Sequence, residues 1–288
     1  MSGRVKASID RWFDIAVRRL PLRTRLRLTY LKSHRRLPNL RRPARFSEFC
    51  QLVKFSGSEL SPFVDKIAVK EIVGQKVGRA HLIPTLYAGD MLPPVKERSW
   101  PLPFILKTSH TSGGNISVRE KPDWPAIERE LSVFLAYDYS HASGEQFYRA
   151  IEPRVLIEPL MGNGKLVDYK IFTFGGKPAA IQVDCDRETV HKRAYFDPSW
   201  KRLDMRIYYP VYEREIERPA QLGKMLEIAS LLGADFPFVR VDLYEIAGQV
   251  YFGELTFSPG GGMKRIEPQD VELEWGELWS QASRSRSG

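Results

Sequence analysis

The sequence predicts a mixed α+β fold, because β-prone apolar runs joined by glycine turns alternate with segments of helical periodicity. The chain has 288 residues, enough to bury a sizeable core in one large domain or two modest ones. The strands are predicted within residues 102–120, 154–184 and 239–256, and the helices within residues 64–78, 125–138 and 217–233.

Proline and glycine predict where several of these elements begin and end. The first helix is expected to end near Gly78, and a strand is expected to follow at residues 82–87. Pro219 is expected to open the helix at 217–233, with Gly233 in the left-handed conformation just past its end.

The composition is that of a soluble globular protein, with 43% hydrophobic and 27% charged residues. Cys50 and Cys185 are too few for a disulfide framework and form no CxxC pair. A reducing cytoplasmic setting is therefore expected, and a zinc site has almost no support. No apolar stretch approaches the length of a membrane span. Because Asp10, Arg11 and Asp14 interrupt the N-terminal apolar residues, we expect no signal peptide.

Positive charge is concentrated at the start of the sequence. The formal net charge of +9 divides into +12 for residues 1–45 and −3 for the remainder. Within this segment, residues 9–20 have the spacing of a basic amphipathic helix. Its apolar face could dock on the domain behind it, or the helix could lie on an anionic membrane or polyanion. No nucleic-acid motif accompanies the charge, so no nucleic-acid partner is expected.

The last predicted hairpin carries two carboxylates inside strands that otherwise look buried. A turn at Ala247-Gly248 would pair Asp242 with position 253 or 254, which places it beside Glu254. Adjacent carboxylates repel each other, and Mg²⁺ would resolve that repulsion while taking its other ligands from substrate phosphates. The pair therefore suggests nucleotide triphosphate chemistry. The alternative is that Asp242 pairs with Arg240 or a lysine and that Glu254 faces water.

Three earlier segments place charged residues beside predicted strands. In "ILKTSHTSGGN", Lys107 ends an apolar strand, and the following loop could bring its backbone N–H groups close to phosphates. The alternative is a Gly-Gly hairpin with a surface lysine. In "VLIEPLM", Glu158 follows an apolar strand where the chain could hold an adenine ring. In "DYKIFTF", Asp168 and Lys170 lie on one side of a strand.

Along the chain, a lysine before a glycine loop is followed by a Glu at a strand end, and then by R-x-D, E-x-T and P-G-G. The order of these motifs resembles that of the ATP-grasp fold. That fold has two α+β subdomains that hold ATP between them. More narrowly, "FILKTSHTSGGN", "DYKIFTFGGKP" and "PFVRVDLYEIAGQVYFGELTFSPGGG" resemble the TupA-like ATP-grasp family. That family is associated with teichuronopeptide and other bacterial surface polysaccharides, capsule included. The resemblance covers nearly the whole chain.

The resemblance implies nucleotide-binding roles for the residues of these motifs. Lys107 would contact the α- and β-phosphates of ATP. Glu158 and the backbone near Leu160 would bind adenine, and Asp168 would hold the ribose hydroxyls. The flap over the phosphates would be formed by Ser112, Gly113, Gly114 and Asn115.

The resemblance also implies a metal site and catalytic groups. Asp242 and Glu254 would bridge Mg²⁺ to the β- and γ-phosphates, and Arg240 would stabilise the charge on the transferring group. Thr256 stands where the broad ATP-grasp pattern E-x-N has an amide ligand, so a second metal ion is in doubt. Lys170 is suited to neutralising the reacting groups.

Some charged residues have open assignments. Arg187 could form a two-pronged contact with a substrate carboxylate or pair with a neighbouring aspartate. Lys66 and Lys70 could face the nucleotide or solvent, and a structural or exposed role is the favoured interpretation for His110 and His191.

By this resemblance the chain is expected to be an ATP-dependent ligase that forms a carbon–nitrogen bond through an acyl phosphate. Its substrates would be a uronic acid or polymer carboxylate and an amine such as an amino acid. The alternatives are an ATP-grasp kinase acting on a sugar hydroxyl and a non-catalytic polyanion- or membrane-binding protein. The expected location is cytoplasmic, with a possible peripheral contact to the inner membrane face through residues 1–45.

The expected organisation follows the same motifs. The segments are a basic arm (1–45), a lead-in of helix and strand (46–100), an ATP-binding subdomain with the glycine flap (101–160), a second ATP-grasp subdomain with the metal site (161–280) and a loose tail (281–288).

Overall fold

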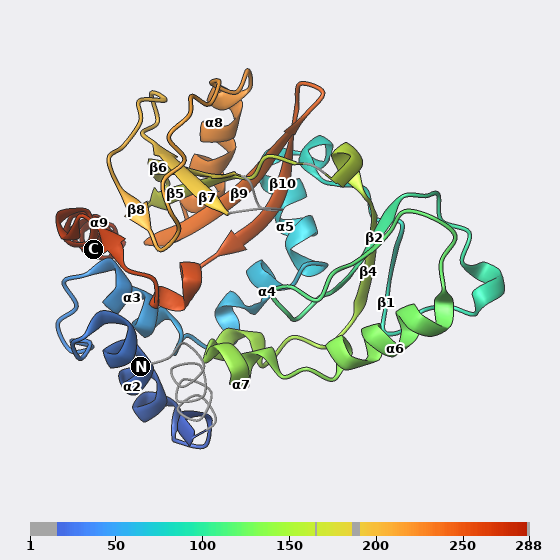
Figure 1. Ribbon diagram of the computed structural model, residues 1–288, viewed down its shortest axis with the longest axis horizontal. Coiled ribbons are helices and arrows are strands. Elements are labelled where there is room, and N and C mark those ends of the chain that lie inside the picture. The colour runs from blue at the N-terminus through green and yellow to red at the C-terminus, as the bar shows by residue number, and fades with distance from the viewer. Residues whose placement is uncertain (1–15, 165, 186–190, 287–288) are drawn as a thin grey trace, which may run out of the picture.

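The computed structural model describes residues 16–164, 166–185 and 191–286. The mixed α+β prediction is confirmed, because two antiparallel sheets are accompanied by helices throughout the described chain. Figure 1 shows the two sheets in separate lobes, with α4 (Ser61–Val64) and α5 (Ala68–Val77) between them.

The first sheet has four strands in the order β1-β4-β2-β3. Its strands are β1 (Tyr87–Gly89), β2 (Phe104–Thr108), β3 (Ile116–Val118) and β4 (Val155–Pro159), and α6 (Trp124–Leu135) packs on it. The strand predicted at 82–87 is wrong in its extent, since Leu82 makes only an isolated bridge to Phe252 and pairing with β4 begins at Tyr87. Pro84 lacks the N–H group that a continuous ladder would need.

The second sheet has five strands in the order β10-β9-β5-β6-β7. The strands are β5 (Tyr169–Phe174), β6 (Lys177–Cys185), β7 (Lys192–Phe196), β9 (Phe238–Ile246) and β10 (Gln249–Thr256). Ala247 and Gly248 both have positive φ, so the predicted hairpin turn is confirmed. Of the three strands predicted within 154–184, β4 belongs to the first sheet and the other two belong to the second.

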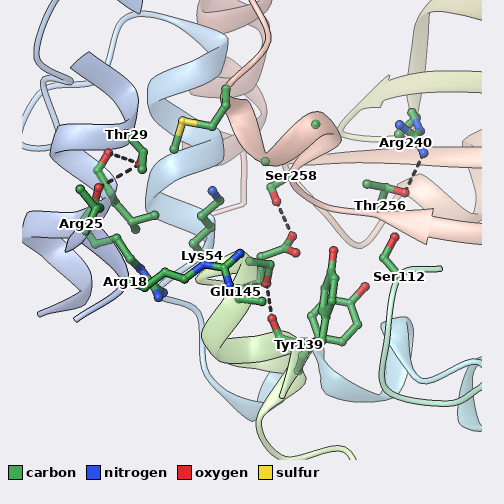
Figure 2. Close-up of a pocket in the computed structure, with 18 of the residues that line it drawn as sticks. Arg18, Arg25, Thr29, Lys54, Ser112, Tyr139, Glu145, Arg240, Thr256 and Ser258 are labelled. Carbon is green, nitrogen blue, oxygen red and sulfur yellow. Dashed lines mark hydrogen bonds between the residues drawn. The ribbon is translucent and has the colours of Figure 1, made fainter. Parts of the chain in front are cut away.

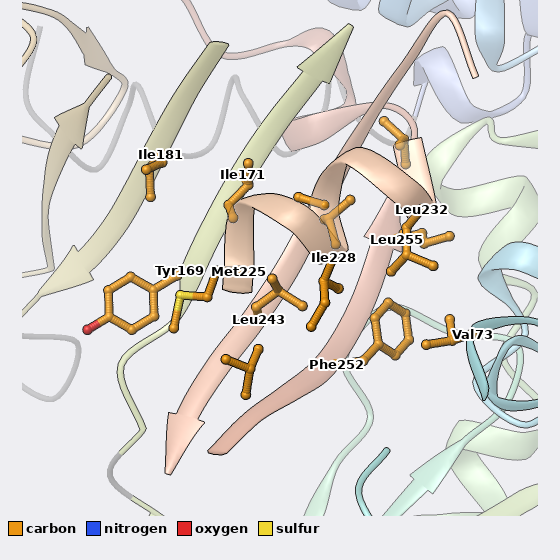
Figure 3. Close-up of a cluster of buried hydrophobic side chains, with 14 of the residues drawn as sticks. Val73, Tyr169, Ile171, Ile181, Met225, Ile228, Leu232, Leu243, Phe252 and Leu255 are labelled. Atoms are coloured by element: carbon orange, nitrogen blue, oxygen red, sulfur yellow. The ribbon is translucent and has the colours of Figure 1, made fainter. Parts of the chain in front are cut away.

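One face of the five-stranded sheet is covered by α8 (Leu222–Gly233), as Figure 3 shows. Met225, Ile228 and Leu232 on the helix pack with strand residues such as Ile171 and Leu243 in one buried cluster. The helix begins at Leu222, later than predicted. The Leu222 N–H donates to the Pro219 carbonyl, so Pro219 lies in the turn that precedes the helix.

The expected left-handed Gly233 is wrong. Gly233 is the last residue of α8 and is not among the glycines with positive φ. A Cβ atom at this position would lie 2.4 Å from Thr173 Oγ1, so close packing of the helix on β5 explains the glycine.

The opposite face of this sheet is divided into an aromatic half and a polar half. The aromatic half packs against α3 (Phe46–Val53) and α9 (Gln269–Arg284), where Phe172 and Phe238 meet Trp275 and Trp279. Because strand side chains alternate, Lys170, Arg240 and Asp242 share this face farther along the same strands.

The basic segment is packed on the body of the protein from α2 (Leu22–His34) onward. Tyr30 Oη lies 2.8 Å from Ser47 Oγ on α3, and Arg265 Nε donates to the Ser33 carbonyl at 2.6 Å. Most of the helix predicted at residues 9–20 lies outside the described residues, although residues 16–18 are helical. No helix in the described ranges is long and apolar enough to cross a bilayer.

Three short elements complete the surroundings of the site. α7 (Tyr139–Ser143) lies near α2 at the edge of the first lobe, as Figure 1 shows. The remaining strands, β8 (Arg206–Ile207) and β11 (Ile266–Glu267), form a separate two-stranded pair.

Candidate active site

The β9–β10 hairpin brings its two carboxylates to directly opposed positions. Asp242 pairs with Glu254 in the register, which shifts between Phe252 and Glu254 at a β-bulge. The sequence-based pairing is therefore confirmed. Lys170 on β5 is the partner of Asp242 on its other side, so three charged residues cross the sheet in one row.

Asp242 is buried and held by two cations. Arg240 donates from Nε and Nη2 to its two carboxylate oxygens at 2.6 and 2.7 Å, and Lys170 Nζ lies 2.5 Å from Oδ2. Burial alone would raise the pKa of Asp242, but Arg240 and Lys170 hold it below its usual value. Asp242 is therefore an anion that orients both cations.

Glu254 is half-exposed and shares the same arginine. Arg240 Nη2 lies 3.3 Å from Glu254 Oε1 and 3.0 Å from Thr256 Oγ1, and the Thr256 hydroxyl lies 3.2 Å from the same glutamate oxygen. The alternative pairing of Asp242 with Arg240 or a lysine is thus present. Glu254 keeps its second oxygen available, since no bond to it is formed within the described residues.

The lysine that precedes the glycine loop belongs to a cluster of three charges on the first lobe. Lys107 Nζ on β2 donates to Glu158 Oε2 on β4 at 2.6 Å, and Lys70 Nζ on α5 forms an ion pair with the other oxygen. Burial opposes ionisation of Glu158, yet the two lysines hold its pKa below the usual value. An adenine contact through this carboxylate would compete with these ion pairs.

Lys66 and Lys70 both turn inward, so the solvent interpretation is wrong for each. Lys66 Nζ donates to the Thr108 carbonyl at 2.9 Å and to the Thr111 carbonyl at the base of the glycine loop. Burial lowers the pKa of Lys66 to about 8. Lys70 Nζ also donates to the Ile83 carbonyl at 2.8 Å.

These groups from the two lobes face one cavity of about 120 Å³. It is lined from the first lobe by Lys66, Lys107, Gly113, Asn115 and Glu158, and from the second by Tyr244, Gly253 and Glu254. An adjoining cavity of about 290 Å³ has Leu160 and Asp168 in its wall. The Leu160 N–H donates to the Pro103 carbonyl at 2.9 Å, and a short 3₁₀ turn (Met161–Gly164) follows it.

A third and larger cavity of about 460 Å³, which we call the chamber, lies on the other side of Arg240, Glu254 and Thr256. Figure 2 shows Lys54, Glu145 and Ser258 in its middle, with Ser112 of the glycine loop at its edge. Sequence reasoning missed these middle residues. Lys54 carried a usable signal, since it follows Cys50 by one helical turn in the otherwise apolar segment "FCQLVKF".

Several expected site residues are placed elsewhere or have other partners. Arg187 lies outside the described residues. His110 is buried beside the loop, and burial lowers its pKa. His191 packs on Tyr209 with ring centroids 4.0 Å apart. Gly114 has positive φ and faces Phe134, so it shapes the loop without lining any of these three cavities.

Of the two carboxylates of the hairpin, Glu254 is the one that fits a Mg²⁺ ion arriving with a nucleotide, because it lines the cavity. Mg²⁺ usually takes only one or two protein carboxylates and completes its shell with phosphate oxygens and water. Glu254 has an oxygen without a bond among the described residues, whereas both oxygens of Asp242 are bonded to Arg240 or Lys170 and would have to exchange these partners for a metal ion. No group of three or more His, Cys, Asp or Glu side chains suited to a metal occurs in the described parts of the chain, so this pair is no preformed cage.

The chain matches the TupA-like ATPgrasp family over residues 50–280, and it belongs to that family. Family membership gives it the ATP-grasp fold. No curated protein matches the chain.

Two solved structures of D-alanine–D-alanine ligases are similar to the chain. The enzyme from Bacillus anthracis is 19% identical with a TM-score of 0.47, and the match covers 81% of this chain and 72% of the ligase. The enzyme from Helicobacter pylori is 20% identical with a TM-score of 0.39, with coverage of 82% and 68%.

Proposed function

We propose that the protein is an ATP- and Mg²⁺-dependent ligase that joins a carboxylate to an amine through an acyl phosphate. The observation that carries the proposal is the cavity shared by Lys66, Lys107 and Glu254, with Arg240 and Lys170 just behind its acidic wall. Lysines opposite Glu254 suit a metal-bound polyphosphate, because the lysines neutralise the phosphate charge and the glutamate neutralises the charge of the metal.

The nucleotide-binding roles divide between the two lobes. We propose that the boundary between the two ATP-grasp subdomains lies near residue 160 of the chain. Lys66, Lys107 and the N–H groups of the loop would hold the phosphates. Leu160 and Glu158 would border the adenine, and Asp168 the ribose. Mg²⁺, when bound at Asp242 and Glu254 with support from Thr256, would neutralise the phosphate oxygens.

The chemistry would take place beside Arg240. A carboxylate oxygen of the substrate attacks the γ-phosphorus, and the bond to the β–γ bridging oxygen breaks to release ADP. The amine then attacks the acyl carbon and expels phosphate, while its proton passes to solvent. Arg240 and Lys170 are fixed by Asp242 and would neutralise the two anions that must approach each other.

The substrates and setting are also part of the proposal. A uronic acid or polymer carboxylate would be joined to an amino acid during the synthesis of a bacterial surface polysaccharide such as capsule. The enzyme would work in the cytoplasm and contact the inner membrane face through exposed basic residues of its first 45, for example Arg23 and Arg27.

Mass spectrometry of the products tests the proposed function. The protein is incubated with ATP, Mg²⁺, a panel of uronic acids and a panel of amino acids. An amide product with one ADP and one phosphate per amide supports the ligase. A phosphorylated sugar formed without any need for the amine would identify a kinase instead. No ADP release with any pair, and no thermal stabilisation by ADP, would favour the non-catalytic alternative.

A further inference from the structure

The chamber next to the proposed reaction centre is lined by cations that the nucleotide does not need. Arg240, Glu254 and Thr256 form its wall toward the nucleotide cavity. Arg18, Arg25 and Lys54 also line it, and in Figure 2 they lie on the side away from Arg240 and Thr256. The basic segment of the sequence therefore supplies part of the wall of a cavity in the body of the protein.

Arg25 is buried without a full set of partners. Its residue is 6% exposed, although it comes from a helix whose neighbouring Arg27 is exposed. The Nη1 atom of Arg25 is buried and makes no hydrogen bond among the described residues. Since a buried guanidinium is costly unless its donors are satisfied, the Arg25 side chain, which lines the chamber, is suited to an anion bound there.

Lys54 adds a second buried cation at the same place. It is 2% exposed, and its ammonium group forms no ion pair within the described ranges. Burial lowers the pKa of Lys54 to about 8, with Arg25 acting in the same direction and Glu145 opposing it. An anion between Arg25 and Lys54 would therefore relieve the repulsion between them.

Glu145 does not supply that anion. Its carboxyl group accepts a hydrogen bond from Ser258 Oγ and lies beside Tyr139 and Lys54. Burial raises the pKa of Glu145 above its usual value. Three cations, Arg18, Arg25 and Lys54, thus share the end of the chamber far from Arg240 with one carboxyl group, so that end has an excess of basic groups.

We propose that the chamber binds a substrate with two anionic groups. One carboxylate reacts beside Arg240, and a second carboxylate or phosphate is held by Arg25, Lys54 and Arg18 at the far end. The volume of about 460 Å³ is large enough for a sugar acid or an amino acid with both groups. This inference rests on the proposed ligase function and makes Arg25 a specificity-determining residue.

Calorimetric titration of the full chain with ADP and Mg²⁺ present tests the inference without turnover. Two pairs of probes are compared, and within each pair the second compound has one more anionic group than the first. The pairs are D-glucuronate with D-glucuronate 1-phosphate, and L-glutamine with L-glutamate. The doubly anionic member of one pair is expected to bind at least about tenfold tighter, as expected for one charge-assisted contact. The pair that responds tells whether the second anion belongs to a sugar or to an amino acid.

Matched variants locate the effect. Arg25→Ala is expected to reduce the preference to less than about threefold, while Arg27→Ala, an exposed position on the same helix, leaves it unchanged. Arg18→Ala provides a second test at an exposed position if Arg25→Ala does not fold.

Equal affinities within both pairs, or a preference that persists in both Arg25→Ala and Arg18→Ala, overturn the inference. Titration of ADP separates this failure from failure of the proposed function. Normal ADP binding with no preference contradicts the inference alone, whereas absent ADP binding contradicts the ligase.

Discussion

The nucleotide cavity and the chamber share Glu254 in their walls, yet they are built differently. The nucleotide cavity is lined mainly by side chains on strands and on the loop between β2 and β3, where Lys107 and Glu158 are already paired. The chamber is assembled from α2, α3, α7 and the segment after β10, and Arg25 and Lys54 have no ion pair among the described residues. In the first cavity Lys70 and Lys107 are both paired with Glu158, whereas in the second Arg25 and Lys54 have positive charge available for a ligand.

The largest expected effect is at the wall between the two cavities. Asp242→Asn and Glu254→Gln should each lower ADP release by a factor on the order of 10³, because each removes a carboxylate that holds the metal–phosphate group. Asp242→Asn should also lower the free energy of unfolding, since Arg240 and Lys170 lose their buried anion. Glu254→Gln should not, because its side chain is 48% exposed. Full activity in both variants would place the metal elsewhere.

The second prediction concerns the unbalanced charge of the chamber. Lys54→Met should raise the free energy of unfolding at pH 7 by up to about 3 kcal/mol, because the pKa of Lys54 falls from 10.5 to about 8 on folding. A lysine with a lowered folded-state pKa costs stability below pH 8, and this cost disappears as pH rises to 10.5. Urea unfolding should therefore show that the difference in unfolding free energy between Lys54→Met and the wild type becomes smaller as pH rises from 7 to 10.5. A difference that is independent of pH would contradict burial of a charged Lys54.

The third prediction concerns the nucleotide cavity. Lys107→Met should weaken ADP binding by roughly 30-fold, the loss of one charge-assisted phosphate contact. Lys96→Met, on an exposed lysine outside the cavity, is the control and should bind ADP normally. Calorimetry with ADP and Mg²⁺ measures both. Equal affinity in the two variants would mean that the phosphates lie away from Lys107.

The smallest expected effect is the acid sensitivity of the ion pairs around Glu158. Its pKa is lowered in the folded protein, so it contributes stability above pH 4.5 that is lost as pH falls through its folded-state pKa. Removal of Lys107 raises that pKa and reduces the contribution. The difference in unfolding free energy between wild type and Lys107→Met, about 1 kcal/mol at pH 7, should therefore vanish at low pH. A difference that grows with acid would show that Glu158 is not stabilised by this lysine.

The sequence was informative where backbone periodicity fixes geometry. The turn at Ala247-Gly248 sets the register of β9 and β10 as far as the pair Leu243–Phe252, which brings Asp242 to position 253 or 254 as predicted, and a β-bulge then selects Glu254. The pairing of Lys107 with Glu158 could not be predicted, because the neighbouring position of β2 and β4 depends on a connection of more than forty residues. Gly233 was misinterpreted because its cause is contact with Thr173, which is sixty residues away in the sequence.

The chamber was beyond sequence reasoning for a different reason. Arg25 is one of many basic residues in the N-terminal segment, and no local pattern separates it from Arg27 on the same helix. Only the docking of α2 on the body makes one arginine buried and leaves the other exposed. Docking on the body, one of the two alternatives for the N-terminal segment, thus makes Arg25 part of a cavity wall.

A crystal structure of the protein with ADP and Mg²⁺ tests the central claim most directly. The account predicts phosphate oxygens within hydrogen-bonding reach of Lys107, with the metal ion touching Glu254 and Asp242 at the wall of the chamber. A nucleotide bound outside this cavity, or a metal ion held away from both carboxylates, would contradict it.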